Sequence, residues 1–207
     1  PSVDGKGLLK DAAYLIWTTT PWTLPANLAI SVHPRLNYNV ILADDKKYVV
    51  GESLLGELTK LLNWEKVSVL GTLKGQELEL EQYKHPLYDR VSPIIVGDHV
   101  TDTDGTGLVH TAPGHGEDDY RIGKTYNLDI LCPVDDKGFM TLKAFQQYFH
   151  EQLDAIYGQN EVSSFFRLLI EHILNLKPVE LALAPDQTIS NAIQEQFDEV
   201  IKRLKRE

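Results

Sequence analysis

The sequence is poor in cysteine, in methionine and in basic side chains. Cys132 is the single cysteine among 207 residues, so no internal disulfide and no cysteine-rich zinc site can form. We expect it to be a small buried apolar side chain. No stretch approaches the roughly 20 apolar residues needed to cross a membrane, and no basic segment followed by an apolar one opens the chain. These absences predict a cytoplasmic protein that makes no membrane contact.

Acidic residues outnumber basic ones by 30 to 20, which gives a formal net charge of −10. A broad, sequence-independent grip on nucleic acid normally needs a basic surface that releases counterions. The charge therefore argues against such a grip but is compatible with a local contact. The hydrophobic fraction of 43% is ordinary for a globular protein with a buried core. Because the chain begins with Pro1 and its only methionine is Met140, we expect it to be part of a longer protein.

Residues 1–139 have the pattern of a β-rich domain, with short aromatic and β-branched runs broken by turn residues. A hairpin is predicted where Asp44-Asp45-Lys46-Lys47 separates two such runs. Apolar spacing predicts helices at 53–62 and 117–126. Together these features indicate a β-barrel-like domain with peripheral helices. The predicted strands cover 14–20, 38–43, 48–50, 66–70, 94–100 and 107–111.

Residues 140–207 have helical spacing instead. One helix is predicted at 142–156, ending at Gly158, and a second at 162–174, whose broad apolar stripe can face neighbours on two sides. Pro178 can open a short third helix, and Ser190 is a candidate N-cap for a fourth. The predicted fold class is therefore α+β, a β-barrel-like domain followed by a small all-α helical bundle.

Two segments of the first domain combine the residue types that chemistry needs. Residues 17–27 read Trp-Thr-Thr-Thr-Pro-Trp-Thr-Leu-Pro-Ala-Asn and bring three hydroxyls to a turn stiffened by two prolines. Residues 105–120 read Gly-Thr-Gly-Leu-Val-His-Thr-Ala-Pro-Gly-His-Gly-Glu-Asp-Asp-Tyr, a strand that runs through a glycine-rich bend into a helix. Bends of this kind bring backbone close to a ligand.

Each of these features also has a purely structural interpretation. The run Thr18–Thr20 suits a strand without any further role, and Glu117–Asp119 suits the N-terminus of any helix. His110 in an apolar strand is more often a hydrogen-bonded core residue than a catalyst, and His115 between glycines can be an ordinary loop residue. Two histidines near acids also suggest zinc, but the spacing of a helical zinc motif is absent, and we expect no metal.

Taken together, the two segments resemble the editing domain of isoleucyl-tRNA synthetases, known as connective polypeptide 1. The resemblance runs from about Gly5 to Met140 and includes Cys-Pro-Val-Asp-Asp-Lys-Gly-Phe at 132–139. Valyl and leucyl relatives typically carry Thr-Thr-Arg-Pro where this chain has Thr-Thr-Pro-Trp at 19–22, which favours the isoleucyl enzyme. The activation motifs His-Ile-Gly-His and Lys-Met-Ser-Lys-Ser are absent, so we expect neither aminoacyl-adenylate formation nor tRNA charging.

The resemblance implies hydrolysis of valine wrongly attached to tRNA(Ile). This family is itself the reference case for limited discrimination, because one methylene separates isoleucine from valine and is worth only ~1–3 kcal/mol in a hydrophobic pocket. The implied partners are the 3′ end of tRNA(Ile) carrying valine and the remainder of the synthetase, with no cofactor.

The same resemblance assigns roles to individual residues. Asp119 is implied to bind the α-ammonium, and His110 to set the size limit beside the amino-acid side chain. Asn27 is implied to shape the site, and Trp17 and Trp22 to flank the terminal adenosine, although packing in the barrel explains either tryptophan equally well. The residues implied to hold the ester and the attacking water are Thr18, Thr19 and Thr20, and further substrate contacts are expected from His115 and Asp118.

From Met140 onward the sequence instead resembles the N-terminal helical domain of HemK-type release factor glutamine methyltransferases. The resemblance rests on packing patterns at 161–174, 176–181 and 200–207. The methyltransferase domain with its Asn-Pro-Pro-Tyr motif is missing, so we expect no methyl transfer. Two interpretations stay open: a binding module for peptide chain release factor, or a passive partner in a chimera joined near Met140, whether natural or engineered.

Overall fold

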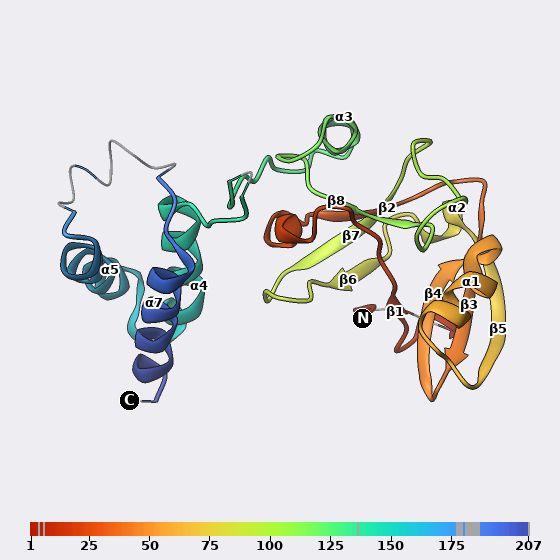
Figure 1. Ribbon diagram of the computed structural model, residues 1–207, viewed down its shortest axis with the longest axis horizontal. Helices are drawn as coiled ribbons and strands as arrows, with labels where there is room; N and C mark the ends of the chain where they lie inside the picture. Colours follow the sequence, from red (N-terminus) through yellow and green to blue (C-terminus); the bar gives the residue numbers. More distant parts are fainter. Residues whose placement is uncertain (4, 6, 136, 177–179, 181–186, 207) are drawn as a thin grey trace. The chain divides into compact units, whose positions relative to one another are not determined.

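The computed structural model of the protein describes residues 1–3, 5, 7–135, 137–176, 180 and 187–206 (Figure 1). The chain divides into two compact units, Pro1–Leu131 and Cys132–Glu207. The predicted α+β class is confirmed, because strands build the first unit and helices build the second. The short third helix predicted at Pro178 lies outside the described residues. Among the described helices, none has both the length and the apolar character of a membrane span.

One sheet of the β-rich unit has the strand order β1-β4-β3-β5. The predicted hairpin is present between β3 (Asn37–Ala43) and β4 (Lys46–Gly51), which pair antiparallel. Asp44 and Asp45 join them with φ values of 46° and 66°, the positive values that a tight hairpin turn requires. The strands at the two edges are β5 (Val67–Lys74), antiparallel to β3, and β1 (Ala13–Tyr14), parallel to β4.

The second sheet has the order β6-β7-β2-β8, and the candidate site lies at its edge strand β8. Its strand β2 (Ala29–Val32) is buried at every residue, so it lacks the alternation that marks a half-exposed strand. It pairs parallel with β7 (Val91–Val96) and antiparallel with β8 (Leu108–Thr111), while β6 (Gln82–Lys84) pairs with β7. In the described residues neither sheet closes on itself, so the barrel-like domain consists of two open sheets.

The two sheets share an apolar core to which both contribute. Val40 and Val49 come from the first sheet, and Ile30, Ile94 and Leu108 from the second, all of them at most 2% exposed. A second cluster lies under η3 (Glu52–Leu54) and α1 (Leu55–Leu61), where Leu54 and Leu58 pack with β3 and β4 side chains. Shorter helical turns occur at η1 (Gly7–Leu9) and α2 (Gly75–Leu78).

The strand predicted at 14–20 is only partly present. Regular pairing ends with Tyr14, and Trp17 forms an isolated bridge to Val109. The threonines after it bond locally instead, since the Thr20 backbone N–H donates to Thr18 Oγ1 at 3.0 Å. Threonine side chains compete in this way with strand ladders, and η2 (Pro21–Ala26) then begins at a proline.

The helical unit contains α4 (Leu142–Tyr157), α5 (Gln159–Leu174) and α7 (Asn191–Leu204). Thr141 caps α4, because its hydroxyl accepts from the Ala144 backbone N–H at 3.2 Å. Ser190 lies at the N-cap position of α7, as predicted, but makes no side-chain capping bond. The interior combines aliphatic side chains with four fully buried aromatic rings, Phe145, Phe149, Phe166 and Phe197.

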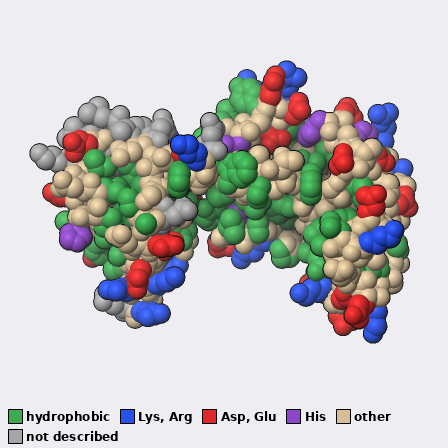
Figure 2. Space-filling view, viewed as in Figure 1, with side chains coloured by type: hydrophobic (Ala, Val, Ile, Leu, Met, Phe, Trp, Pro, Cys, Tyr) green, Lys and Arg blue, Asp and Glu red, His purple; other side chains and the backbone are tan. Residues whose placement is uncertain are grey.

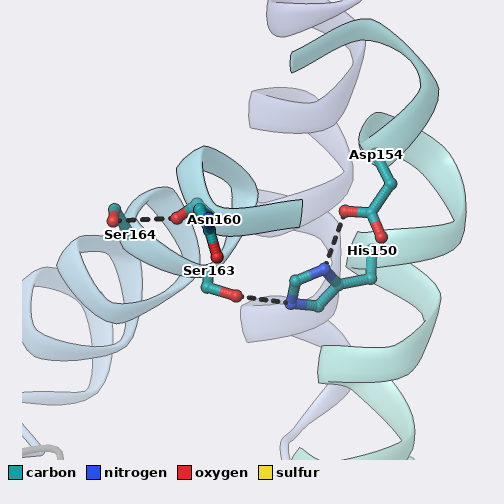
Figure 3. Close-up of polar contacts among 5 residues, drawn as sticks. All are labelled: His150, Asp154, Asn160, Ser163 and Ser164. Atoms are coloured by element: carbon teal, nitrogen blue, oxygen red, sulfur yellow. Dashed lines mark hydrogen bonds and ion pairs between the residues drawn. The ribbon is translucent and has the colours of Figure 1, made fainter. Parts of the chain in front are cut away.

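A polar contact ties α4 to α5 (Figure 3). His150 Nδ1 lies 2.7 Å from Asp154 Oδ1 within α4, and His150 Nε2 lies 3.2 Å from Ser163 Oγ in α5. The order of these groups is that of a serine hydrolase relay. However, Ser163 is the fifth residue of α5, where the backbone N–H belongs to the helix itself, and it offers no oxyanion donor. We interpret the contact as a tie between helices.

Cys132 lies at the beginning of the helical unit and is exposed. The expectation that it is a buried apolar side chain is therefore wrong. The residue stands in a segment without helix or strand before α4, and no regular element buries its side chain.

Candidate functional site

The two motif segments meet along β8. The Trp17 backbone N–H donates to Leu108 O at 2.8 Å, and the His110 N–H donates to Trp17 O at 3.0 Å. The Trp17 ring lies against Gly105, which has a φ of +70° and no room for a side chain. Gly107 similarly approaches Gly51, because a Cβ on it would lie 3.1 Å from the Gly51 Cα. These two glycines therefore allow close packing within the protein, and they lie before β8, whereas the glycine-rich bend at Gly114 and Gly116 follows it.

The turn after Trp17 holds its hydroxyls in a chain with a definite direction. Thr23 Oγ1 donates to Thr20 O at 2.8 Å, which uses its one proton. In the 3.3 Å contact between Thr20 Oγ1 and Thr23 Oγ1, Thr20 must therefore be the donor. Thr18 must in turn donate in its 3.4 Å contact with Thr20 Oγ1. Thr18 and Thr20 thus have lone pairs, and no protons, left for a ligand.

His110 connects this turn to the interior. Its Nε2 lies 3.0 Å from Thr23 Oγ1, and its Nδ1 lies 2.8 Å from Asn27 Nδ2. Asn27 Nδ2 also donates to Ala29 O at 2.9 Å, and Asn27 Oδ1 accepts from the Tyr83 hydroxyl. An amide nitrogen can only donate, so His110 Nδ1 is the acceptor and Nε2 carries the proton.

Burial keeps the His110 ring neutral. The residue is 5% exposed, and desolvation, with smaller effects from His85 and His115, lowers its pKa to about 4. A charged imidazole could not accept from Asn27, so the hydrogen bonds favour the same neutral form. At neutral pH the ring presents no net charge to its surroundings.

Asp119 lies in the first turn of α3 (Glu117–Thr125), the helix that follows β8 and the glycine-rich bend. Its carboxylate accepts from the Ala112 backbone N–H at 2.8 Å. Burial raises its pKa, while the Ala112 bond and the charges of His99 and His115 oppose that rise. The carboxylate is thus partly desolvated, and a cation can offset the cost of this desolvation.

The remaining expected site residues are more exposed. Trp17 and Trp22 are 44% and 46% exposed, and apolar side chains gather on the visible face of the β-rich unit (Figure 2). Thr19 and Asp118 are exposed, and His115 is half-buried. Direct hydrogen bonds join Thr18, Thr20, Asn27 and His110 into one network through Thr23. The side chains of Thr19, Trp22, Asp118 and Asp119 lie outside it, and that of Asp119 bonds to the Ala112 backbone.

Two members of the network, Thr23 and Tyr83, were not predicted from the sequence, nor was the neighbouring buried His85. Thr23 was inside a quoted motif, and its place three residues after Thr20 in a proline-stiffened turn was the available signal. His85 lies 3.0 Å from Leu24 O through Nε2, and its Nδ1 accepts from the Leu87 N–H at 3.0 Å. Tyr83 and His85 belong to β6 and the residue after it, a segment without any recognisable pattern.

No group of three or more metal-ligating side chains is present among the described residues. A depression of about 170 Å³ lies away from the network and is polar. The residues that line it are Arg35, Leu36, Asn37, Glu52, Ser53, Lys74 and Asp102.

The sequence is similar to isoleucine-tRNA ligases over most of its length. It is 54% identical over 155 residues to the enzyme of Bacillus cereus (strain B4264), and equally to isoleucine-tRNA ligase 1 of Bacillus thuringiensis subsp. konkukian (strain 97-27). In each case the match covers 73% of this chain and 17% of the relative. The chain therefore spans about a sixth of the length of these relatives.

The fold is similar to that of solved editing domains. The cytosolic leucyl-tRNA synthetase editing domain of P. knowlesi superposes with a TM-score of 0.51 at 18% identity, covering 95% of this chain and 84% of that one. The domain of P. falciparum gives 0.52 at 15% identity, covering 95% and 79%. Residues 145–207 match the model of the PrmC N-terminal domain. The chain thus resembles an isoleucyl-tRNA synthetase editing domain followed by a HemK-like N-terminal domain.

Proposed function

From this twofold resemblance as a premise, we propose that the β-rich unit is a proofreading hydrolase that removes valine from misacylated tRNA(Ile). The observation that carries the proposal is the network that joins Thr18 and Thr20 to His110 and Asn27 beside the segment leading to Asp119. In the reaction, water adds to the ester carbonyl and the bond from that carbon to the ribose oxygen breaks. One proton from water ends on the ribose hydroxyl, and the products are valine and a tRNA end that carries no amino acid.

Asp119 is proposed to bind the α-ammonium of the attached amino acid. Its partly desolvated carboxylate already accepts from the Ala112 N–H, and a second charge-assisted bond to an ammonium group is strong and directional. The ammonium would replace the solvation that burial removes. This contact fixes one end of the amino acid and so orients the ester carbonyl.

Thr18 and Thr20 are proposed to hold the attacking water by its hydrogens. Their protons are committed along the chain that ends at Thr20 O, so each offers a lone pair to a donor. A water that donates to both has its own lone pairs directed away from the turn, toward a carbonyl carbon. Aminoacyl esters are reactive, and positioning of this kind can supply much of the catalysis. Thr19, which is exposed, is proposed to contact the ester.

His110 is proposed to form the wall against which the amino-acid side chain lies, and the buried Asn27 to shape the site by holding the His110 ring. A neutral, hydrogen-bonded ring cannot move aside without breaking the bonds to Thr23 and Asn27. A rigid wall discriminates valine from isoleucine by excluding one carbon. The exposed rings of Trp17 and Trp22 are proposed to stack on the terminal adenosine, with His115 and Asp118 making further substrate contacts.

Hydrolysis assays with the 207-residue chain test the proposal. We expect valine release from Val-tRNA(Ile) to be much faster than isoleucine release from Ile-tRNA(Ile). Asp119→Ala should slow release by about 10- to 100-fold, the usual worth of a hydrogen bond to a charged group. Glu117→Gln is the matched control, because Glu117 is exposed and paired with Arg121 on the same helix. Equal rates for the two amino acids, or full activity of Asp119→Ala, would defeat the proposal.

If hydrolysis is slow, a binding assay distinguishes two causes, weak binding of the tRNA and the absence of an amino-acid pocket. A sulfamoyl analogue of valyl-adenosine contains the amino acid and the terminal nucleoside without the rest of the tRNA. We expect it to bind the wild type more tightly than the isoleucyl analogue. Binding should weaken in Asp119→Ala but not in Glu117→Gln.

For residues 140–207 we propose a binding module for peptide chain release factor, with residues 1–139 as the editing domain. The match of 145–207 to the PrmC N-terminal domain supports this, as does the closed aromatic core that would let the bundle fold. A pull-down with purified release factor tests it. Capture supports a module, and failure of capture with an intact helical CD spectrum supports the passive-partner alternative.

A further inference from the structure

We propose that Tyr83 is a positioning residue of the site, which acts through Asn27 to fix the proton of His110 on Nε2 and thereby leaves the Thr23 hydroxyl free to donate to Thr20 O. The expected fall in kcat rests on the proposed function, whereas the expected His110 tautomer does not. The juxtaposition that carries it is a continuous series of contacts from β6 to the turn at Thr20.

The first step is the orientation of the Asn27 amide. Asn27 is 1% exposed and Tyr83 is 4% exposed, so water does not compete for their contacts. Burial raises the pKa of Tyr83, and the phenol therefore stays protonated and donates to Asn27 Oδ1. With Oδ1 held on that side, both amide hydrogens point away, to Ala29 O and His110 Nδ1.

The second step is the tautomer. His110 Nδ1 accepts from Asn27, which leaves Nε2–H as the donor to Thr23 Oγ1. Thr23 Oγ1 then accepts hydrogen bonds from both His110 Nε2–H and the Thr20 hydroxyl, and it donates its own proton in a hydrogen bond to Thr20 O. If His110 carried its proton on Nδ1 instead, Nε2 would compete for the Thr23 proton. The hydroxyl bond from Thr23 to Thr20 O would be lost, and of the described bonds only that of the Thr23 backbone N–H, at 3.0 Å, would still hold that carbonyl.

Tyr14 offers a matched control. Its ring packs edge-to-face on Tyr83, with centroids 6.4 Å apart, and its buried hydroxyl has no hydrogen-bond partner among the described residues. Tyr14→Phe therefore removes the same atom from the same neighbourhood without touching Asn27. Tyr83→Phe removes the donor to Asn27 Oδ1.

The experiment combines ¹⁵N NMR of the histidine rings at pH 7 with hydrolysis of Val-tRNA(Ile), both on the full chain. We expect the wild type and Tyr14→Phe to show His110 as the Nε2–H tautomer, and Tyr83→Phe to show a mixture. Asn27→Asp should reverse the tautomer to Nδ1–H, because a carboxylate cannot donate. In Tyr83→Phe, kcat should fall about tenfold, as for the loss of one hydrogen bond, with KM nearly unchanged.

The outcomes distinguish the two proposals. An Nδ1–H tautomer in the wild type, or an unchanged tautomer and kcat in Tyr83→Phe, overturns the positioning role. If the tautomer changes as expected but the chain hydrolyses no aminoacyl ester, the arrangement around Tyr83 is supported and the proposed function is overturned. Equal losses of kcat in Tyr14→Phe and Tyr83→Phe also overturn the positioning role, since they indicate general loosening of the core.

Discussion

The two units differ in what they bury. In the β-rich unit, polar side chains such as Asn27, His85, His110 and Thr111 are at most 5% exposed, and the described contacts give them hydrogen-bond partners. In the described part of the helical unit, Thr141 is the buried polar residue, and the rest of the interior is apolar and aromatic. The core of the β-rich unit thus requires hydrogen-bond partners for its buried polar groups, whereas the core of the helical unit requires close packing of apolar side chains.

This difference indicates where a reaction can be housed. Buried polar groups are costly unless they are all paired, so a fold that retains many of them near one strand fixes their positions closely. In the β-rich unit they surround β8 and the turn that bridges to it. In the described part of the helical unit, the contacts of His150 with Ser163 and of the Tyr157 hydroxyl with Leu204 O each join two helices.

The largest effect should come from the aromatic core. Phe145 is fully buried, with its ring 4.7 Å from that of Phe197. Phe145→Ala should lower the free energy of unfolding by about 3–5 kcal/mol, as for other large cavities. Urea titration followed by helical CD measures it. Leu168→Ala, at a residue 65% exposed, should change the value by less than about 0.5 kcal/mol. Equal effects of the two substitutions would show that Phe145 does not belong to the core.

A pH-dependent effect should distinguish the β-rich unit next. His110 has a pKa lowered to about 4 from about 6.5 in the unfolded chain. Its neutral form therefore contributes stability that is present above pH 6.5 and is lost as the pH falls toward 4. Between pH 7 and 4.5 the wild type should lose about 2–3 kcal/mol more than His110→Gln, at about 1.4 kcal/mol per pKa unit. Parallel pH profiles of the two proteins in urea unfolding would contradict the buried neutral ring.

Asp119 should show the opposite sign. Its folded pKa is raised by burial, so its stabilising contribution is present below the ordinary carboxyl pKa of about 3.9 and is lost as the pH rises through the folded value. Asp119→Asn keeps an acceptor for Ala112 N–H and should be more stable than the wild type at pH 7, by about 1–2 kcal/mol. The gain in stability should vanish below about pH 3.9. Hydrolysis by Asp119→Asn should be slowed, as in Asp119→Ala. Asp118→Asn, at an exposed position, should leave thermal stability unchanged.

The sequence predicts the regular elements better than it predicts the network. Helical spacing located α4 and α5 closely, because a one-sided core imposes a period on the sequence. The strand β2 was missed because both of its faces are buried, which removes the period. Tyr83 was missed for another reason: its role depends on a contact 56 positions away, with Asn27, and a single sequence contains no signal of such a contact.

The smallest effect tests whether the contact between His150 and Ser163 is only structural. Ser163→Ala removes the bond to His150 Nε2 but gains helix propensity, so the free energy of unfolding should fall by no more than about 1 kcal/mol. Ser164→Ala is the matched control, because Ser164 is exposed and bonds to Asn160 O in its own helix. It should be neutral or slightly stabilising. Loss of hydrolysis of a simple ester such as p-nitrophenyl acetate in Ser163→Ala, but not in Ser164→Ala, would show that the His150 contact is a reactive site, and the contrast between the units would then fail.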